Sequence, residues 1–117
     1  MIQLNLLVIK TNQVEKVHHF YQQLGLHFTH HRHGKGPLHY AAEMNGLVFE
    51  IYPLPQASAE VDKSTRLGFT VQKLAVILPQ LDASAIISLP QQREWGYTAL
   101  VKDPDGRKIE LTEAQAF

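Results

Sequence analysis

The sequence predicts an α+β fold of two tandem βαβββ modules, whose curved mixed sheets form a shared cleft. The first observation is an internal repeat, because the turn dipeptides Asn-Gly at 45–46 and Asp-Gly at 105–106 lie 60 residues apart. The second is that a strand-like segment follows each dipeptide, at 47–51 and 107–111. A fixed internal period indicates a fold made of copies of one unit.

The first module covers residues 1–53. Its apolar run at 4–9 predicts a central strand covered on both faces. Asn12 and Glu15 have the spacing of a capping box that begins a helix, and Gly25 is a typical residue to end it. Turn residues then separate three predicted strands, at 26–33, 38–44 and 47–52.

A linker at 54–64, rich in proline and small residues, leads to the second module, 65–113. A strand at 66–71 precedes a helical stripe in which Pro79 either kinks the helix or lies near its true start. A weaker strand at 85–89 and a loop at 90–94 follow. A hairpin of two strands, at 96–102 and 107–112, completes the module.

Composition excludes several function classes. The 117 residues include 11 acidic and 11 basic ones and no cysteine, so thiolate metal sites and disulfides are excluded. The sequence has no basic stripe of the kind that indicates a nucleic-acid partner. No apolar run approaches the roughly 20 residues that span a bilayer, and the N-terminus does not resemble a signal peptide. We therefore expect a cytoplasmic protein that does not bind membranes.

Two motifs carry a resemblance to a known family. Residues 11–16 lead into Phe-Tyr-Gln-Gln-Leu-Gly-Leu at 20–26, and Asp-Pro-Asp-Gly-Arg-Lys-Ile-Glu-Leu occupies 103–111. With the duplicated βαβββ pattern, the chain resembles the vicinal oxygen chelate superfamily, which includes glyoxalases, bleomycin-resistance proteins and extradiol dioxygenases. The resemblance covers essentially the whole chain and implies the glyoxalase-like fold, often as a homodimer. It does not choose between the activities that this fold hosts.

The resemblance also implies a place for a divalent metal, with two ligands from each module on its first and last strands. Those positions are Leu6, Glu50, Arg66 and Glu110 here. The glutamates match, but Leu6 cannot ligate a metal and Arg66 carries a permanent positive charge. The metal site is therefore expected to be degraded.

Three interpretations of this cluster remain open. Arg66 can form ion pairs with Glu50 and Glu110 in place of a metal, or the three can bind the polar part of a ligand. Alternatively, the two glutamates hold a metal (Mn, Mg, Ni, Fe or Zn) together with a ligand from elsewhere. Strand alternation adds an apolar wall for a small molecule, formed by Leu6, Val8 and Tyr52.

Histidines and aromatic residues supply further candidates. His27, His31 and His33 share one face of a predicted edge strand, and His30 points the opposite way. His39 is the histidine best placed to face the cleft. Trp95 and Tyr97 either line the cleft or cover an exposed edge or a dimer contact. The segment 34–37 is a hairpin connection, since it lacks the spacing of a phosphate loop.

The sequence thus favours a small-molecule-binding protein that does not depend on a metal. The alternative is a metal-dependent lyase, isomerase or dioxygenase acting on a small oxygenated substrate, in which Glu110 or Glu50 moves a proton. A structural domain without a ligand is the third class.

Overall fold

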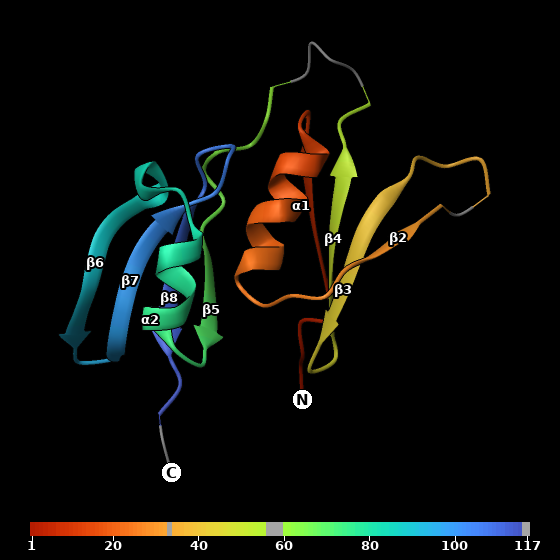
Figure 1. The fold of residues 1–117 in the computed structure, drawn as a ribbon. Coiled ribbons are helices and arrows are strands. Elements are labelled where there is room, and N and C mark those ends of the chain that lie inside the picture. The colour runs from red at the N-terminus through yellow and green to blue at the C-terminus, as the bar shows by residue number, and fades with distance from the viewer. Residues whose placement is uncertain (33, 56–59, 116–117) are drawn as a thin grey trace. The chain divides into compact units, whose positions relative to one another are not determined.

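The computed structural model describes residues 1–32, 34–55 and 60–115 and confirms the duplicated α+β architecture (Figure 1). The chain forms two compact units, Met1–Asp62 (unit 1) and Lys63–Phe117 (unit 2). His33 and part of the predicted linker, residues 56–59, lie outside the described residues. No helix in the described ranges has the length and apolar character needed to cross a membrane.

Both units have the same order of elements and the same sheet topology. Unit 1 contains β1 (Leu6–Thr11), α1 (Val14–Gln23), β2 (Thr29–His31), β3 (His39–Met44) and β4 (Leu47–Pro53), with strand order β1-β4-β3-β2. Unit 2 contains β5 (Leu67–Val71), α2 (Leu74–Ile77), two 3-10 turns (Leu78–Gln80 and Ala83–Ala85), β6 (Ile86–Arg93), β7 (Gly96–Lys102) and β8 (Lys108–Glu113), with strand order β5-β8-β7-β6. The first strand of each unit pairs in parallel with the last, and the other pairs are antiparallel.

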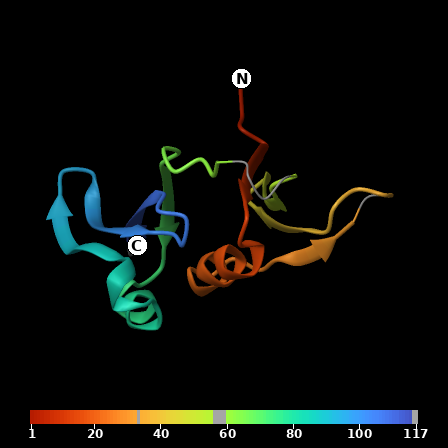
Figure 2. The same ribbon diagram turned by 90° about the horizontal axis from the view of Figure 1, so that it is seen from above.

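In each unit the helix covers one face of the sheet (Figures 1 and 2). The buried apolar side chains of α1 pack with those of β4, so Tyr21 meets Phe49 edge-on at 5.0 Å between ring centroids. Burying a large apolar side chain stabilises a fold by about 1.5–3 kcal/mol. The cores are Ile9, Val17, Phe20, Tyr21, Leu24, Ala42, Phe49 and Ile51 in unit 1, and Val71, Leu74, Ile77, Leu78, Leu81, Ala99, Val101, Ile109 and Leu111 in unit 2.

The predicted turns are confirmed. Asn45 and Gly46 both have positive φ angles, 50° and 84°, which is the conformation of a two-residue hairpin turn. Gly25 follows Leu24, the C-cap residue of α1, with φ 114°, a left-handed conformation that glycine adopts without strain. Helix α2 gives way to a 3-10 turn that contains Pro79, as expected of a proline within a helical stripe.

The predicted capping box is wrong. Gln13 is the residue before α1, and its side chain makes no capping hydrogen bond. Its backbone N–H donates to Thr11 Oγ1 at 3.1 Å, while the Glu15 carboxylate accepts a hydrogen bond from the Tyr40 hydroxyl at 2.9 Å. Glu15 is therefore engaged by a residue of β3, which is distant in sequence, and not by the start of its own helix.

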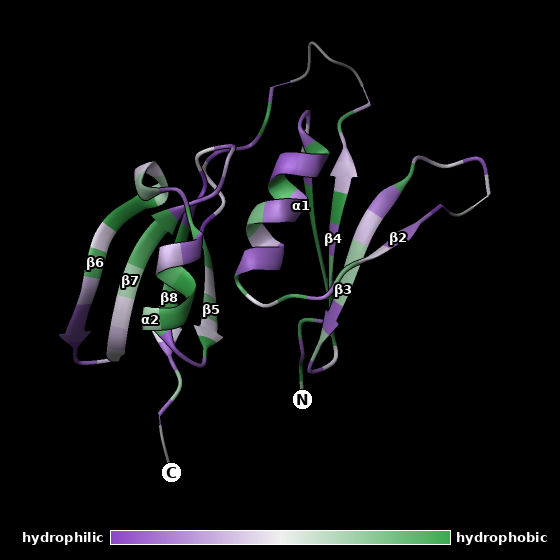
Figure 3. Ribbon diagram, in the orientation of Figure 1, coloured by the Kyte–Doolittle hydropathy of each residue, from purple (hydrophilic) through white to green (hydrophobic). Residues whose placement is uncertain are grey.

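Strand boundaries differ from the prediction in both units. The prediction of a central strand covered on both faces is wrong. Strand β1 is an edge of its four-stranded sheet, and Leu6 and Val8 are exposed. The loop predicted at 90–94 is wrong as well, because β6 continues to Arg93. The pairing of β6 with β7 shifts between Ser88 and Gln91, and such a bulge on an edge strand accommodates Pro90. Figure 3 shows the hydrophilic end of this strand.

A buried ion cluster organises the turn between β7 and β8. Arg107 Nη1 lies 3.0 Å from both Asp103 Oδ2 and Asp105 Oδ2, and all three side chains are buried. Asp103 Oδ1 also accepts the backbone N–H groups of Asp105 and Arg107. Burial lowers the pKa of Arg107, but the hydrogen bonds and charges of the two aspartates outweigh it and raise that pKa. The turn motif that carried the family resemblance is thus a structural element of unit 2.

Candidate functional site

The strand register places the predicted site residues of unit 1 on the sheet face that α1 leaves uncovered. Val8 pairs with Glu50 and Leu6 with Val48, so their side chains share one face. Leu6 is 50% exposed and Val8 38%, whereas Ile9 on the opposite face is buried. Unit 1 therefore presents an accessible apolar strip beside Glu50, as the alternation predicted.

His39 joins Glu50 and Tyr52 in a compact cluster on this face. His39 Nε2 lies 3.0 Å from Glu50 Oε2, and the His39 ring stacks on Tyr52 with centroids 4.1 Å apart and planes 8° apart. His39 is only 1% exposed. Burial first, and the negative charge of Glu50 second, raise the pKa of the Tyr52 phenol. This face therefore combines a carboxylate, an imidazole and a neutral phenol.

In unit 2, Arg66 and Glu110 form a loose ion pair. Arg66 directly precedes β5, and its Nη2 lies 4.0 Å from Glu110 Oε2, with side-chain exposures of 58% and 33%. The position opposite Glu110 on β5 is Gly68, which has no side chain to fill the space. An exposed pair at this distance contributes only about 0–1 kcal/mol, so a ligand can compete for either partner at little cost.

A small pocket lies beside this pair. Its volume is about 110 Å³, and a second guanidinium, that of Arg93, lines it together with Arg66, Glu110 and Trp95. Arg93 stands over the Trp95 ring, with its central carbon 5.7 Å from the ring centroid. The sequence analysis missed Arg93 because it placed residues 90–94 in a loop. The alternation of Arg93 and Trp95, two residues apart, was the available signal.

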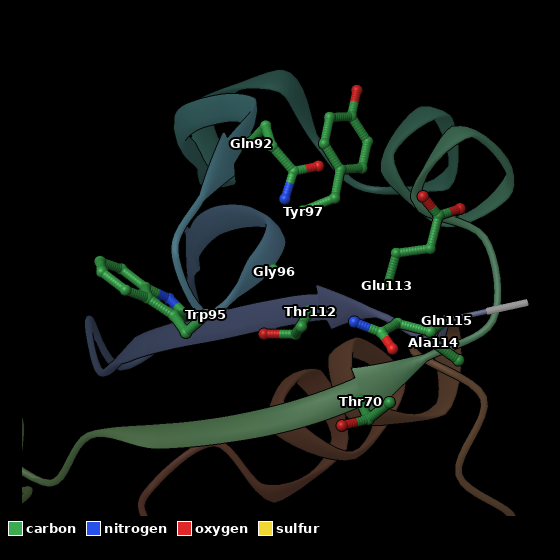
Figure 4. A pocket seen from close by; sticks show the side chains of 9 residues that line it. All are labelled: Thr70, Gln92, Trp95, Gly96, Tyr97, Thr112, Glu113, Ala114 and Gln115. Carbon is green, nitrogen blue, oxygen red and sulfur yellow. The ribbon is translucent and has the colours of Figure 1, made fainter.

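Trp95 and Tyr97 line a second, larger pocket of unit 2, of about 370 Å³ (Figure 4). Both are partly exposed, at 61% and 40%. The prediction that Arg66 shares a cleft with Glu50 concerns residues of different units and stays a prediction.

The other histidines lie on the two faces of the sheet of unit 1. His30 and His18 stack on opposite sides of the Tyr40 ring, at 4.3 and 3.7 Å between centroids, on the face that α1 covers. Burial, the largest cause, lowers the pKa of His18. His31 lies on the other face, with its ring 5.9 Å from that of His39. His27 precedes β2, so the expected row of histidines along one strand is not formed by His27 and His31.

The donor atoms in the described ranges fit a metal only in part. His39 Nε2 and Glu50 Oε2 lie 3.0 Å apart, which is the ordinary length of a direct contact between an imidazole nitrogen and a carboxylate. Two ligands at right angles on one octahedral metal ion have about the same separation. Leu6 and Arg66 supply no ligand at the other two family positions. Among the described residues, no group of three or more histidine, aspartate or glutamate side chains is arranged to hold a metal.

The duplicated βαβββ units, the parallel pairing of first and last strands and the turn motif at 103–107 define the class of protein. The chain has the glyoxalase-like fold, as the sequence motifs implied.

Solved structures of similar fold cover nearly the whole chain. The oxidase ChaP-H2 has a TM-score of 0.72 at 16% identity, covering 98% of this chain and 95% of its own. The antibiotic-binding protein TnmS3 from Streptomyces sp. CB03234 has a TM-score of 0.71 at 19% identity, covering 98% of each chain. An integron cassette protein from V. Cholerae has a TM-score of 0.68 at 20% identity, covering 98% and 97%.

At these identities the likeness establishes the fold alone. No protein-family model matches the chain, and no curated protein matches it either.

Proposed function

We propose that this protein binds a small molecule bearing an acidic group, without depending on a metal. The observation that carries the proposal is the pocket of about 110 Å³ in unit 2, which two arginines line beside Glu110 and Trp95. With Arg66 and Arg93 against one carboxylate, the pocket has a net positive charge. Guanidinium groups recognise carboxylates and phosphates through paired hydrogen bonds, and Trp95 offers a flat surface for an attached ring.

The uncovered face of unit 1 carries a second set of groups that suits a small molecule. Leu6 and Val8 provide exposed apolar area, and Glu50, Tyr52 and His39 provide polar groups beside it. A pocket that is mostly apolar, with a few polar groups, is typical of small-molecule sites. The antibiotic-binding description of the structurally similar TnmS3 is consistent with a role of this kind.

The test uses Trp95, the one tryptophan of the chain, as a reporter. Benzoate is titrated against its neutral counterpart benzamide while the fluorescence of Trp95 is followed. We expect a saturable change with benzoate. Arg66→Gln should weaken benzoate binding about tenfold, because the free energy of a charged hydrogen bond at an exposed site is at the low end of its usual range. Arg32→Gln, which removes an exposed arginine from unit 1, is the matched control and should leave binding unchanged. Equal binding of benzamide, or of benzoate by the Arg66→Gln variant, contradicts the proposal.

A metal-dependent lyase, isomerase or dioxygenase is the second candidate, because His39 Nε2 and Glu50 Oε2, two groups that commonly bind metals, lie 3.0 Å apart. Calorimetric titration of chelator-treated protein with Mg²⁺, Mn²⁺, Fe²⁺, Ni²⁺ and Zn²⁺ separates the two candidates. Stoichiometric binding that Glu50→Ala and His39→Ala abolish supports the metal enzyme.

A further inference from the structure

The larger pocket of unit 2 is built from polar groups that the acidic-group pocket does not use, and it shares Trp95 with that pocket. It has a volume of about 370 Å³, within the usual range for ligand sites. It lies where the turn between β6 and β7 meets the ends of β5 and β8. Thr70 and Thr112 pair across the parallel strands β5 and β8, so both hydroxyls lie on the uncovered face of the sheet.

Three polar side chains of this pocket are available to a ligand. Within the described ranges, Thr70, Thr112 and Gln115 make no side-chain hydrogen bond or ion pair. Hydroxyl and amide groups both donate and accept hydrogen bonds. The three side chains therefore match a ligand with several neighbouring hydroxyl groups.

Thr112 is held in place by its neighbour Gly96. A Cβ atom added to Gly96 would lie 2.9 Å from Thr112 Cγ2, so the methyl group of Thr112 occupies the space that glycine leaves. The hydroxyl therefore takes another position on the threonine, and in Figure 4 it points toward the Trp95 end of the pocket.

Trp95 forms the aromatic end of the pocket, and Glu113 and Gln115 lie at the other end (Figure 4). A flat, exposed indole face packs against the C–H groups of a saturated ring, while polar groups around it bind the ring's hydroxyls. Arg93 lies over the Trp95 ring, and the indole is still 61% exposed.

Charge separates this pocket from the smaller one. Glu113 is its one carboxylate, and among the described residues that line it none is lysine or arginine. An anion is therefore disfavoured here, whereas a neutral polyhydroxylated ring is not.

We propose that this pocket binds a neutral, polyhydroxylated ring of the monosaccharide type, stacked on Trp95 and hydrogen-bonded by Thr70, Thr112 and Gln115. Because Trp95 lines both pockets, the ring can be the sugar portion of the acidic ligand proposed above. The sugar pocket itself does not require that link.

The experiment titrates the protein with the methyl pyranosides of glucose, galactose, mannose and N-acetylglucosamine, again following Trp95 fluorescence. We expect at least one to give a saturable change, which Thr112→Val weakens about threefold to tenfold by removing a hydroxyl while keeping its shape. Thr65→Val, a threonine that lines neither pocket, is the matched control.

The outcomes distinguish this proposal from the proposed function. Glycoside binding should persist in Arg66→Gln, and benzoate binding should persist in Thr112→Val. If none of the four glycosides gives a saturable change, or if folded Thr112→Val and Thr70→Val bind them as the original protein does, the sugar pocket is refuted. Loss of benzoate binding alone would refute only the acidic-group pocket.

Discussion

The buried cluster of Arg107, Asp103 and Asp105 makes the sharpest prediction about stability. Arg107→Met removes a guanidinium that is fully buried and contacts both carboxylates at 3.0 Å, while the methionine retains most of the apolar stem. The aspartates, 2% and 8% exposed, then stay buried without their counter-charge. Removing one partner of a buried pair costs about 3–5 kcal/mol, a large part of the roughly 5–15 kcal/mol that stabilises a typical domain.

The assay is urea unfolding, followed by far-UV circular dichroism and by Trp95 fluorescence, which reports on unit 2. With a slope of about 1–3 kcal/mol per molar urea, the midpoint should fall by at least about 1 M. Arg66→Met is the control, because its exposed pair with Glu110 should contribute at most about 1 kcal/mol.

A milder substitution refines the test. Arg107→Lys should retain part of the stability, since a single nitrogen, Nη1, makes both contacts and an ammonium can replace one of them. If Arg107→Met lowers the free energy of unfolding by less than about 1 kcal/mol, the buried cluster does not stabilise the turn and this reasoning is refuted.

Three further predictions concern backbone strain and pH. Gly96→Ala should destabilise more than Gly25→Ala in urea unfolding, because both have positive φ but only Gly96 has Thr112 within 2.9 Å of a new Cβ; equal losses would contradict the clash. Burial first, and then its hydrogen bond to Glu15, raise the pKa of Tyr40. The contribution of the neutral phenol to the free energy of unfolding is therefore complete below the pKa of an unfolded tyrosine and is lost as pH rises through the folded value. Absorbance titration, with Tyr40→Phe identifying the signal, should show a lower pKa in Glu15→Gln; no change would argue against the hydrogen bond. Burial lowers the pKa of His18, so its contribution to stability is present above the pKa of free histidine and is lost as pH falls through the folded value; proton NMR should find the midpoint of His18 below that of free histidine, and a midpoint at or above it would contradict the burial effect.

Local chemistry made much of the fold predictable. The turn at Asn45-Gly46 and the helix end at Gly25 depend on φ angles that few residues adopt, so the sequence identifies them directly. The alternation on β4 likewise predicted that Glu50 and Tyr52 share the uncovered face with Leu6 and Val8.

The errors arose where long-range contacts decide local structure. Glu15 binds Tyr40 instead of capping its own helix, and a bulge lets Pro90 stay within edge strand β6. Neither effect is visible in a local pattern, because the partner is distant along the chain.

The sequence by itself determined the duplicated architecture and the faces of the strands, since these follow from periodicity and residue chemistry. Tertiary structure decided which candidates meet: His39 with Glu50 and Tyr52, Arg93 with Trp95 and Arg66, and Thr70 with Thr112. It also decided that the aspartates and arginine of the 103–107 turn are buried. The physical reason is that distances and burial depend on strand register and pairing, which join residues far apart in the chain.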